Sequence, residues 1–172
     1  FGINKNSIVL TASDAGWING HTYSLFGPLS HGSTTILIEK PISLVDIKFF
    51  KKILSLKVSV IYLPVTLIRL IRSLNKNFRI NKKYIKCIGS MGEPLAPSVA
   101  KWFSNKFLNK NKAVVNTYFQ TETGGIVCSP KYNQSTKQVP HGSVGEPFSK
   151  YIKINKLKKK SLNEVKIITP WP

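Results

Sequence analysis

Acidic residues and arginines are scarce in this chain of 172 residues. Seven Asp and Glu stand against 26 Lys and Arg, which gives a formal net charge of +19, and only Arg69, Arg72 and Arg79 are arginines. Arginine reads bases and phosphates through a bidentate fork, so its scarcity disfavours a sequence-specific nucleic-acid-binding protein. The lysines are scattered among Asn and Ile, which is typical of an AT-rich coding sequence and a solvated surface. A basic nucleic-acid-binding module is the alternative interpretation of this charge.

Cysteine and long apolar runs are also lacking. Cys87 and Cys128 form no Cys-x-x-Cys pair and have no His at metal-ligand spacing, so we expect buried thiols in a reducing compartment. The sequence has no run of about 18 apolar residues and no signal peptide, which predicts a cytoplasmic protein without a membrane span. The chain begins at Phe1 and ends in an apolar Pro-Trp-Pro, so we expect a partial domain, residues 1–172, truncated at both ends.

Hydrophobic residues make up 42% of the chain, enough for one domain with a core. Strands, the second of them buried, alternate with helices at short spacing, which predicts an α/β fold: a mostly parallel sheet flanked by helices on both faces. The expected strands are 7–12, 34–38, 58–63, 85–89 and 113–116, and the expected helices are 17–29, 44–54, 64–74 and 97–108. Two further strands, 151–154 and 165–168, predict a short antiparallel hairpin outside the main sheet.

Three of the seven acidic residues follow predicted strands. In open α/β sheets, ligands bind beyond the carboxyl ends of the strands, so Asp14, Glu93 and Glu122 are candidate site residues. Each has a structural alternative. Asp14 would cap the helix at Trp17, Glu93 would pair with a nearby Lys, and Glu122 would cap a helix after its strand.

The segments around these residues resemble a known enzyme superfamily. YFQTETGG, residues 118–125, resembles the Tyr-x-Gln/Ser-Thr-Glu signature of adenylate-forming enzymes, and NTYFQTETGGIVCSP is similar to the AMP-forming acetyl-CoA synthetase branch. SMGEPLAP, residues 90–97, resembles that branch's adenine-binding segment, and residues 13–39 resemble its acyl-pocket helix and the strand after it. Residues 62–71 and 141–148 match in the same order. The resemblance covers essentially the whole chain and implies part of the large N-terminal domain.

The resemblance also implies roles for individual residues. Tyr118 would lie against adenine, Thr121 would bind a phosphate, and Glu122 would ligate the Mg²⁺ that bridges the ATP phosphates. The implied ATP/AMP-binding residues are Gly92, Glu93, Pro94, Asn116, Thr117, Tyr118, Phe119, Gln120 and Thr121. The implied acyl-pocket and CoA-path residues are Trp17, Ile18, Asn19, Met91 and Phe119. For Trp17, Met91 and Phe119 the alternative is an ordinary place in the core.

The implied function is that of an AMP-forming short-chain acyl-CoA synthetase. It would convert acetate or propionate, ATP and CoA into acyl-CoA, AMP and pyrophosphate. Three positions depart from the family: Asn116 stands where Asp is frequent, Asn19 where Thr is found, and Phe119 where acetate-specific members have Trp. A ligase for a longer or different acid is therefore the second alternative. The family's phosphate loop and catalytic Lys would lie outside residues 1–172, so we expect this chain alone to be inactive.

Overall fold

The computed structural model describes residues 1–39, 46–74, 79–109, 111–148, 150, 152–156 and 163–168. Its centre is a parallel sheet with the strand order β2-β1-β3-β4-β5. These strands are β1 (Ile8–Thr11), β2 (Thr34–Ile36), β3 (Val60–Pro64), β4 (Cys87–Met91) and β5 (Val115–Asn116). The predicted α/β fold is confirmed.

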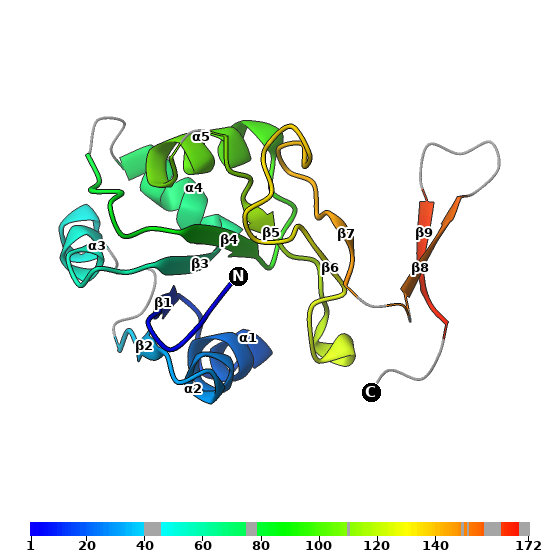
Figure 1. The fold of residues 1–172 in the computed structure, drawn as a ribbon, viewed down its shortest axis with the longest axis horizontal. Helices are drawn as coiled ribbons and strands as arrows, with labels where there is room; N and C mark the ends of the chain where they lie inside the picture. The colour runs from blue at the N-terminus through cyan, green and yellow to red at the C-terminus, as the bar shows by residue number, and fades with distance from the viewer. Residues whose placement is uncertain are drawn as a thin grey trace.

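Helices cover both faces of the sheet (Figure 1). On one face lie α3 (Ile47–Leu54), α4 (Val65–Leu74) and α5 (Pro97–Phe107). On the other face, one continuous helical segment consists of α1 (Ile18–His21), the π-helical turn η1 (Thr22–Phe26) and α2 (Gly27–Ser30). The helix predicted from Trp17 is thus present, but a π turn in its middle was not anticipated.

Strand alternation divides the core between the two faces. Ile61 and Ile88 point into the larger cluster, where they join buried residues of α3, α4 and α5 such as Phe50, Ile68 and Phe103. Val9, Val60, Cys87 and Val115 form the smaller cluster on the opposite face, where Phe1 and Ile3 pack against them. β3 carries apolar side chains on both faces because it lies inside a parallel sheet that is covered on both sides.

Several local expectations are wrong. The predicted strand 34–38 is shorter and is not buried: Leu37 is 64% exposed, because β2 lies at the edge of the described sheet. Asp14 does not cap the helix; its carboxylate accepts a 2.7 Å hydrogen bond from the Gly16 amide within a turn. Pro64 ends β3, and α4 begins one residue later. The first two residues of the helix predicted over 44–54 lie outside the described residues.

The C-terminal part holds two antiparallel pairs. The hairpin of β8 (Ile152–Lys156) and β9 (Asn163–Ile167) confirms the prediction and stands to one side of the main sheet (Figure 1). The pair of β6 (Cys128–Ser129) and β7 (Glu146–Pro147) was not predicted. Ile152 is buried with Val127 and Cys128, which attaches the hairpin to β6. Among the described residues, no helix has the length and apolar character that crossing a membrane requires.

Candidate functional site

The polar segments identified in the sequence meet at one edge of the sheet. Because β1, β4 and β5 are parallel, the segments 12–17, 92–96 and 117–125 all leave the carboxyl ends of their strands on the same side. β4 and β5 are direct neighbours, with Ser90 paired in register with Asn116. The two segments with the strongest resemblance to nucleotide-binding motifs therefore start side by side.

The buried side chain of Asn116 makes two hydrogen bonds that stabilise this edge. Its Oδ1 accepts a 2.9 Å hydrogen bond from the Ser90 hydroxyl. Its Nδ2 donates a 3.0 Å hydrogen bond to the carbonyl oxygen of Gly142. Gly142 has a φ of +86°, and a Cβ there would lie 2.6 Å from the Leu95 carbonyl oxygen. The amide thus ties two strands to a closely apposed loop, a role that resemblance alone did not indicate.

Thr117 is also held inside the protein. Its backbone amide and its hydroxyl both donate to the Ser90 carbonyl oxygen, at 3.0 and 2.9 Å. The Tyr62 hydroxyl lies 2.6 Å from Thr117 Oγ1, and it must be the donor because the single hydroxyl proton of Thr117 is already used. Burial raises the pKa of Tyr62 far above its ordinary value, which keeps that donor protonated.

The Gly92–Pro94 segment presents its backbone at the edge of the sheet. Gly92 has a φ of +86°, and no atom of the described residues lies within 4 Å of the place where a Cβ would stand, so its backbone is open to close approach by a ligand. Glu93 forms a 3.0 Å ion pair with Arg69 of α4. The expected pairing is therefore present, with Arg instead of Lys. Both side chains are at least 38% exposed, so the pair contributes about 1 kcal/mol or less.

Residues 118–125 form a short turn after β5. Thr121–Thr123 is a 3₁₀ turn, η3, which is capped by the side chains of Gln120 and Thr123, so the capping role considered for Glu122 belongs to other residues. Tyr118, Thr121 and Glu122 are exposed, and Gly124 ends the turn in the left-handed region. In the part of the chain that the structure describes, Glu122 makes no ion pair.

A magnesium site would have to be completed by phosphate here. The described residues contain no group of three His, Cys, Asp or Glu side chains placed to hold a metal. Mg²⁺ commonly takes one or two carboxylates together with substrate phosphates and water. One exposed carboxylate at the carboxyl edge of the sheet, with the Thr121 hydroxyl beside it in sequence, fits that pattern.

The residues predicted for the acyl pocket have different environments. Trp17 is 65% exposed and is not a core residue, whereas Met91 is 1% exposed. Ile18, Asn19 and Phe119 are partly buried. Asn19 Oδ1 is buried and has no hydrogen-bond partner among the described residues. Phe119 is in contact with Tyr23 of η1, at a centroid distance of 5.7 Å.

Sequence reasoning missed Tyr23, Tyr62 and Ser90. Tyr62 had a recognisable signal, because a tyrosine inside an apolar strand needs a partner for its hydroxyl. The partners of Ser90 and Tyr23 depend on pairings between distant segments, so their roles required the fold.

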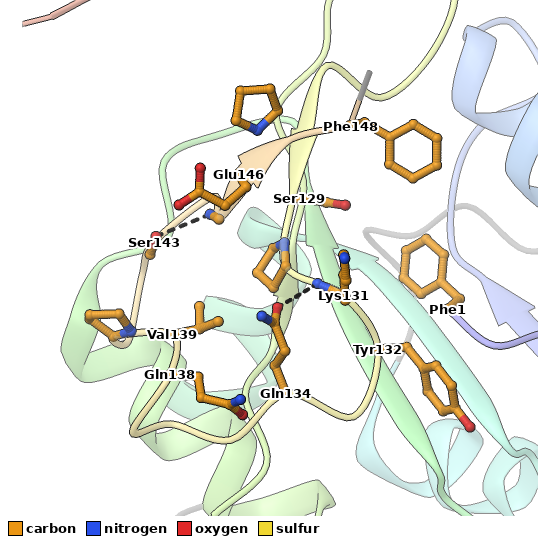
Figure 2. A pocket seen from close by; sticks show the side chains of 14 residues that line it. Phe1, Ser129, Lys131, Tyr132, Gln134, Gln138, Val139, Ser143, Glu146 and Phe148 are labelled. Atoms are coloured by element: carbon orange, nitrogen blue, oxygen red, sulfur yellow. Dashed lines mark hydrogen bonds between the residues drawn. The ribbon is translucent and has the colours of Figure 1, made fainter. Parts of the chain in front are cut away.

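A cavity of about 430 Å³ is lined by none of the residues predicted for the site. Figure 2 shows this cavity between Phe1 and the loop 129–148, with Lys131, Tyr132, Glu146 and Phe148 around it. Its polar groups partly satisfy one another: Ser143 Oγ accepts from the Gly145 amide, and Gln134 Oε1 accepts from the Lys131 amide (Figure 2). The candidate site is instead the open edge formed by the strand ends.

Comparisons of the chain with a family model and with curated proteins agree on one family. Residues 1–166 match the family described as AMP-binding enzyme. The chain is 37% identical over 133 residues to an acetyl-coenzyme A synthetase of Helicobacter pylori, covering 76% of this chain and 20% of that protein. It is 34% identical over 151 residues to acetyl-coenzyme A synthetase 1 of Saccharomyces cerevisiae, covering 86% and 21%. The chain thus spans about a fifth of the length of the curated relatives it matches.

A solved structure supports the fold. The crystal structure of the anthranilate CoA ligase AuaEII in complex with anthranoyl-AMP matches with a TM-score of 0.76. The match covers 92% of this chain and 29% of that one, at 14% sequence identity.

Proposed function

Because the chain belongs to the AMP-binding enzyme family, we propose that it forms part of the adenylation domain of an AMP-forming acyl-CoA synthetase for short carboxylic acids. The observation that carries the proposal is the hydrogen-bonded start of the β4 and β5 segments, where Ser90 and Asn116 meet at 2.9 Å. That pairing brings the Gly-Glu-Pro segment and the Gln-Thr-Glu segment to one edge. The matched residues make up only about a fifth of the curated relatives' length, which supports a larger domain around residues 1–172.

The proposed reaction has two steps. A carboxylate oxygen of the acid attacks the α-phosphorus of ATP, and the bond to pyrophosphate breaks, which gives an acyl-adenylate. The CoA thiol, losing its proton, then attacks the acyl carbon, and AMP leaves. Neither step demands covalent chemistry from these residues, so their contribution is positioning and electrostatic stabilisation.

The exposed residues of the edge are the ones proposed to touch the nucleotide. The backbone of Gly92–Pro94 and the ring of Tyr118 border adenine, and the Thr121 hydroxyl donates to a phosphate oxygen. Glu122 holds Mg²⁺, which when bound offsets phosphate charge. Asn116, Thr117 and Gln120 support the same site, because each takes part in hydrogen bonds that hold its segment in place.

The acid is proposed to be acetate or propionate, with Phe119 limiting its length. Phe119 is partly buried and stands edge-on to Tyr23, so its ring is fixed in a wall and not free at the surface. Acetyl-coenzyme A synthetases among the relatives support a short acid. A Phe in place of the family's Trp leaves slightly more room, so propionate should react nearly as well as acetate.

The test measures kcat/KM of the full-length enzyme for acetate, propionate, butyrate and octanoate. Phe119→Trp should sharpen the preference for acetate, and Phe119→Gly should admit acids several carbons longer, since one methylene is worth roughly 10–200-fold in an apolar pocket. Phe148→Trp, at a Phe that is 73% exposed, is the matched control and should leave the profile unchanged. A wild-type preference for octanoate, or an unmoved profile in Phe119→Gly, would reject the short-acid proposal.

A further inference from the structure

Tyr23 contacts Phe119 through its ring and contacts the chain after Glu122 through its hydroxyl. We propose that Tyr23 is a positioning residue that sets the specificity for the length of the acid, an inference that rests on the proposed function. Its ring fixes Phe119 in the acyl wall, and its hydroxyl holds the turn that carries Thr121 and Glu122.

The backbone of Tyr23 is fastened to the sheet. Tyr23 lies in the π-helical turn η1, and such turns inside α-helices are frequent at functional sites. The Thr11 hydroxyl donates a 2.8 Å hydrogen bond to the Tyr23 carbonyl oxygen, and the Thr35 hydroxyl donates to that of Ser24 at 2.5 Å. Two neighbouring strands thus bind two successive carbonyls of the π turn, which sets the position of the Tyr23 side chain relative to the strand ends.

The ring of Tyr23 stands between two other aromatic rings. It meets Phe119 at a centroid distance of 5.7 Å and an interplanar angle of 63°, and it meets Tyr62 at 5.5 Å and 89°. Both are edge-to-face arrangements, which aromatic quadrupoles favour. Tyr62 is itself fixed by its hydrogen bond to Thr117. Phe119 therefore packs against the ring of Tyr23, which in turn packs against the buried Tyr62.

The hydroxyl of Tyr23 reaches the far end of the same segment. Burial raises the pKa of Tyr23 to about 12, against a smaller lowering by the Ile126 backbone, so the group is a neutral phenol at physiological pH. A Cβ added to Gly125 would lie 4.0 Å from the phenolic oxygen. Ring and hydroxyl thus contact residues on both sides of Thr121 and Glu122.

Two substitutions in the full-length enzyme separate these two contacts. Tyr23→Leu removes the ring beside Phe119 and should raise the ratio of kcat/KM for butyrate over acetate by roughly three- to tenfold, less than the 10–200-fold that one fully accommodated methylene can give. Tyr23→Phe keeps the ring and removes the hydroxyl, so it should leave that ratio within about twofold while raising KM for MgATP by a similar roughly three- to tenfold factor. Tyr84→Leu and Tyr84→Phe, at an exposed tyrosine before the amino end of β4, are the matched controls and should change neither quantity.

A double substitution tests whether Tyr23 acts through Phe119. In a Phe119→Gly background, Tyr23→Leu should have no further effect on the butyrate-to-acetate ratio, because the ring it positions is gone. An unchanged ratio in Tyr23→Leu alone, or the same shift in both backgrounds, would overturn the proposal. Should Tyr23→Leu fail to accumulate as folded protein, Tyr23→Phe decides: a shifted ratio or an unchanged KM for MgATP overturns it. An enzyme that activates none of the acids refutes the proposed function instead.

Discussion

The side-chain amide of Asn116 donates a hydrogen bond to the carbonyl oxygen of Gly142, which lies 26 residues further along the chain. Asn116 also accepts a hydrogen bond from the Ser90 hydroxyl, and the two bonds together join β4, β5 and the loop around Gly142. The donor end of the amide is essential to that arrangement. A carboxylate of the same shape could accept from Ser90 but could donate nothing to Gly142.

We expect Asn116→Asp to destabilise the protein by about 1–3 kcal/mol, because two buried oxygen acceptors would then face each other. Urea unfolding, followed by circular dichroism, measures the change. Asn6→Asp makes the same chemical change at an exposed turn position and should alter stability by less than about 0.5 kcal/mol. Equal stability of Asn116→Asp and the wild type would show that the bond to Gly142 contributes nothing.

Glu122→Gln should leave the fold intact and strongly depress acyl-adenylate formation in the full-length enzyme. The side chain is exposed and does not cap its turn, so the substitution removes the proposed metal ligand without removing a structural contact among the described residues. ATP–pyrophosphate exchange at varied Mg²⁺ measures the effect. Glu146→Gln, another exposed carboxylate, is the control and should exchange at the wild-type rate. An unchanged rate in Glu122→Gln would exclude this residue from the proposed metal site.

The net charge of +19 should not confer specific nucleic-acid binding. The charge is dispersed along the chain and comes almost entirely from lysine, which supplies nonspecific attraction to phosphates. A mobility assay at physiological salt should give dissociation constants in the nonspecific range of roughly 10⁻⁴ to 10⁻⁶ M. Nanomolar binding that depends on base sequence would favour the alternative function.

Stability should decline between pH 9 and pH 11 because of Cys87. Burial raises the pKa of this thiol from 9.0 to about 11, so the fold favours the neutral form. That contribution is complete below pH 9, where the unfolded thiol is also neutral, and is lost as the pH rises to 11. The two-unit shift corresponds to at most about 3 kcal/mol. Cys87→Ala should flatten this part of the pH profile, measured by urea unfolding under reducing conditions; parallel profiles for both proteins would contradict the assignment.

Local patterns predicted the alternation of strands and helices because buried parallel strands and amphipathic helices each leave a periodic signal. They could not predict the exposure of β2, which depends on its place at the sheet edge, nor the π turn of η1, whose residues also suit an α-helix. For the site, sequence placed the carboxylates of Glu93 and Glu122 after the correct strands. The partners of Asn116, Thr117 and Tyr23 come from segments far apart in the chain, and only tertiary structure brings them together.

Because α4 follows β3 without a loop, the width of the candidate site is set by the backbone and not by side chains. β3 ends at Pro64 and α4 begins at Val65, so no loop follows β3 that could separate the segment after β1 from the segment after β4. Those two strands flank β3 in the sheet and are therefore separated by two hydrogen-bonding intervals, about 9–10 Å. Substitutions along the two segments can make the space shallower or deeper. The distance across the candidate site is set by the hydrogen-bonded spacing of the strands, so substitutions at this edge can change its depth more readily than its breadth.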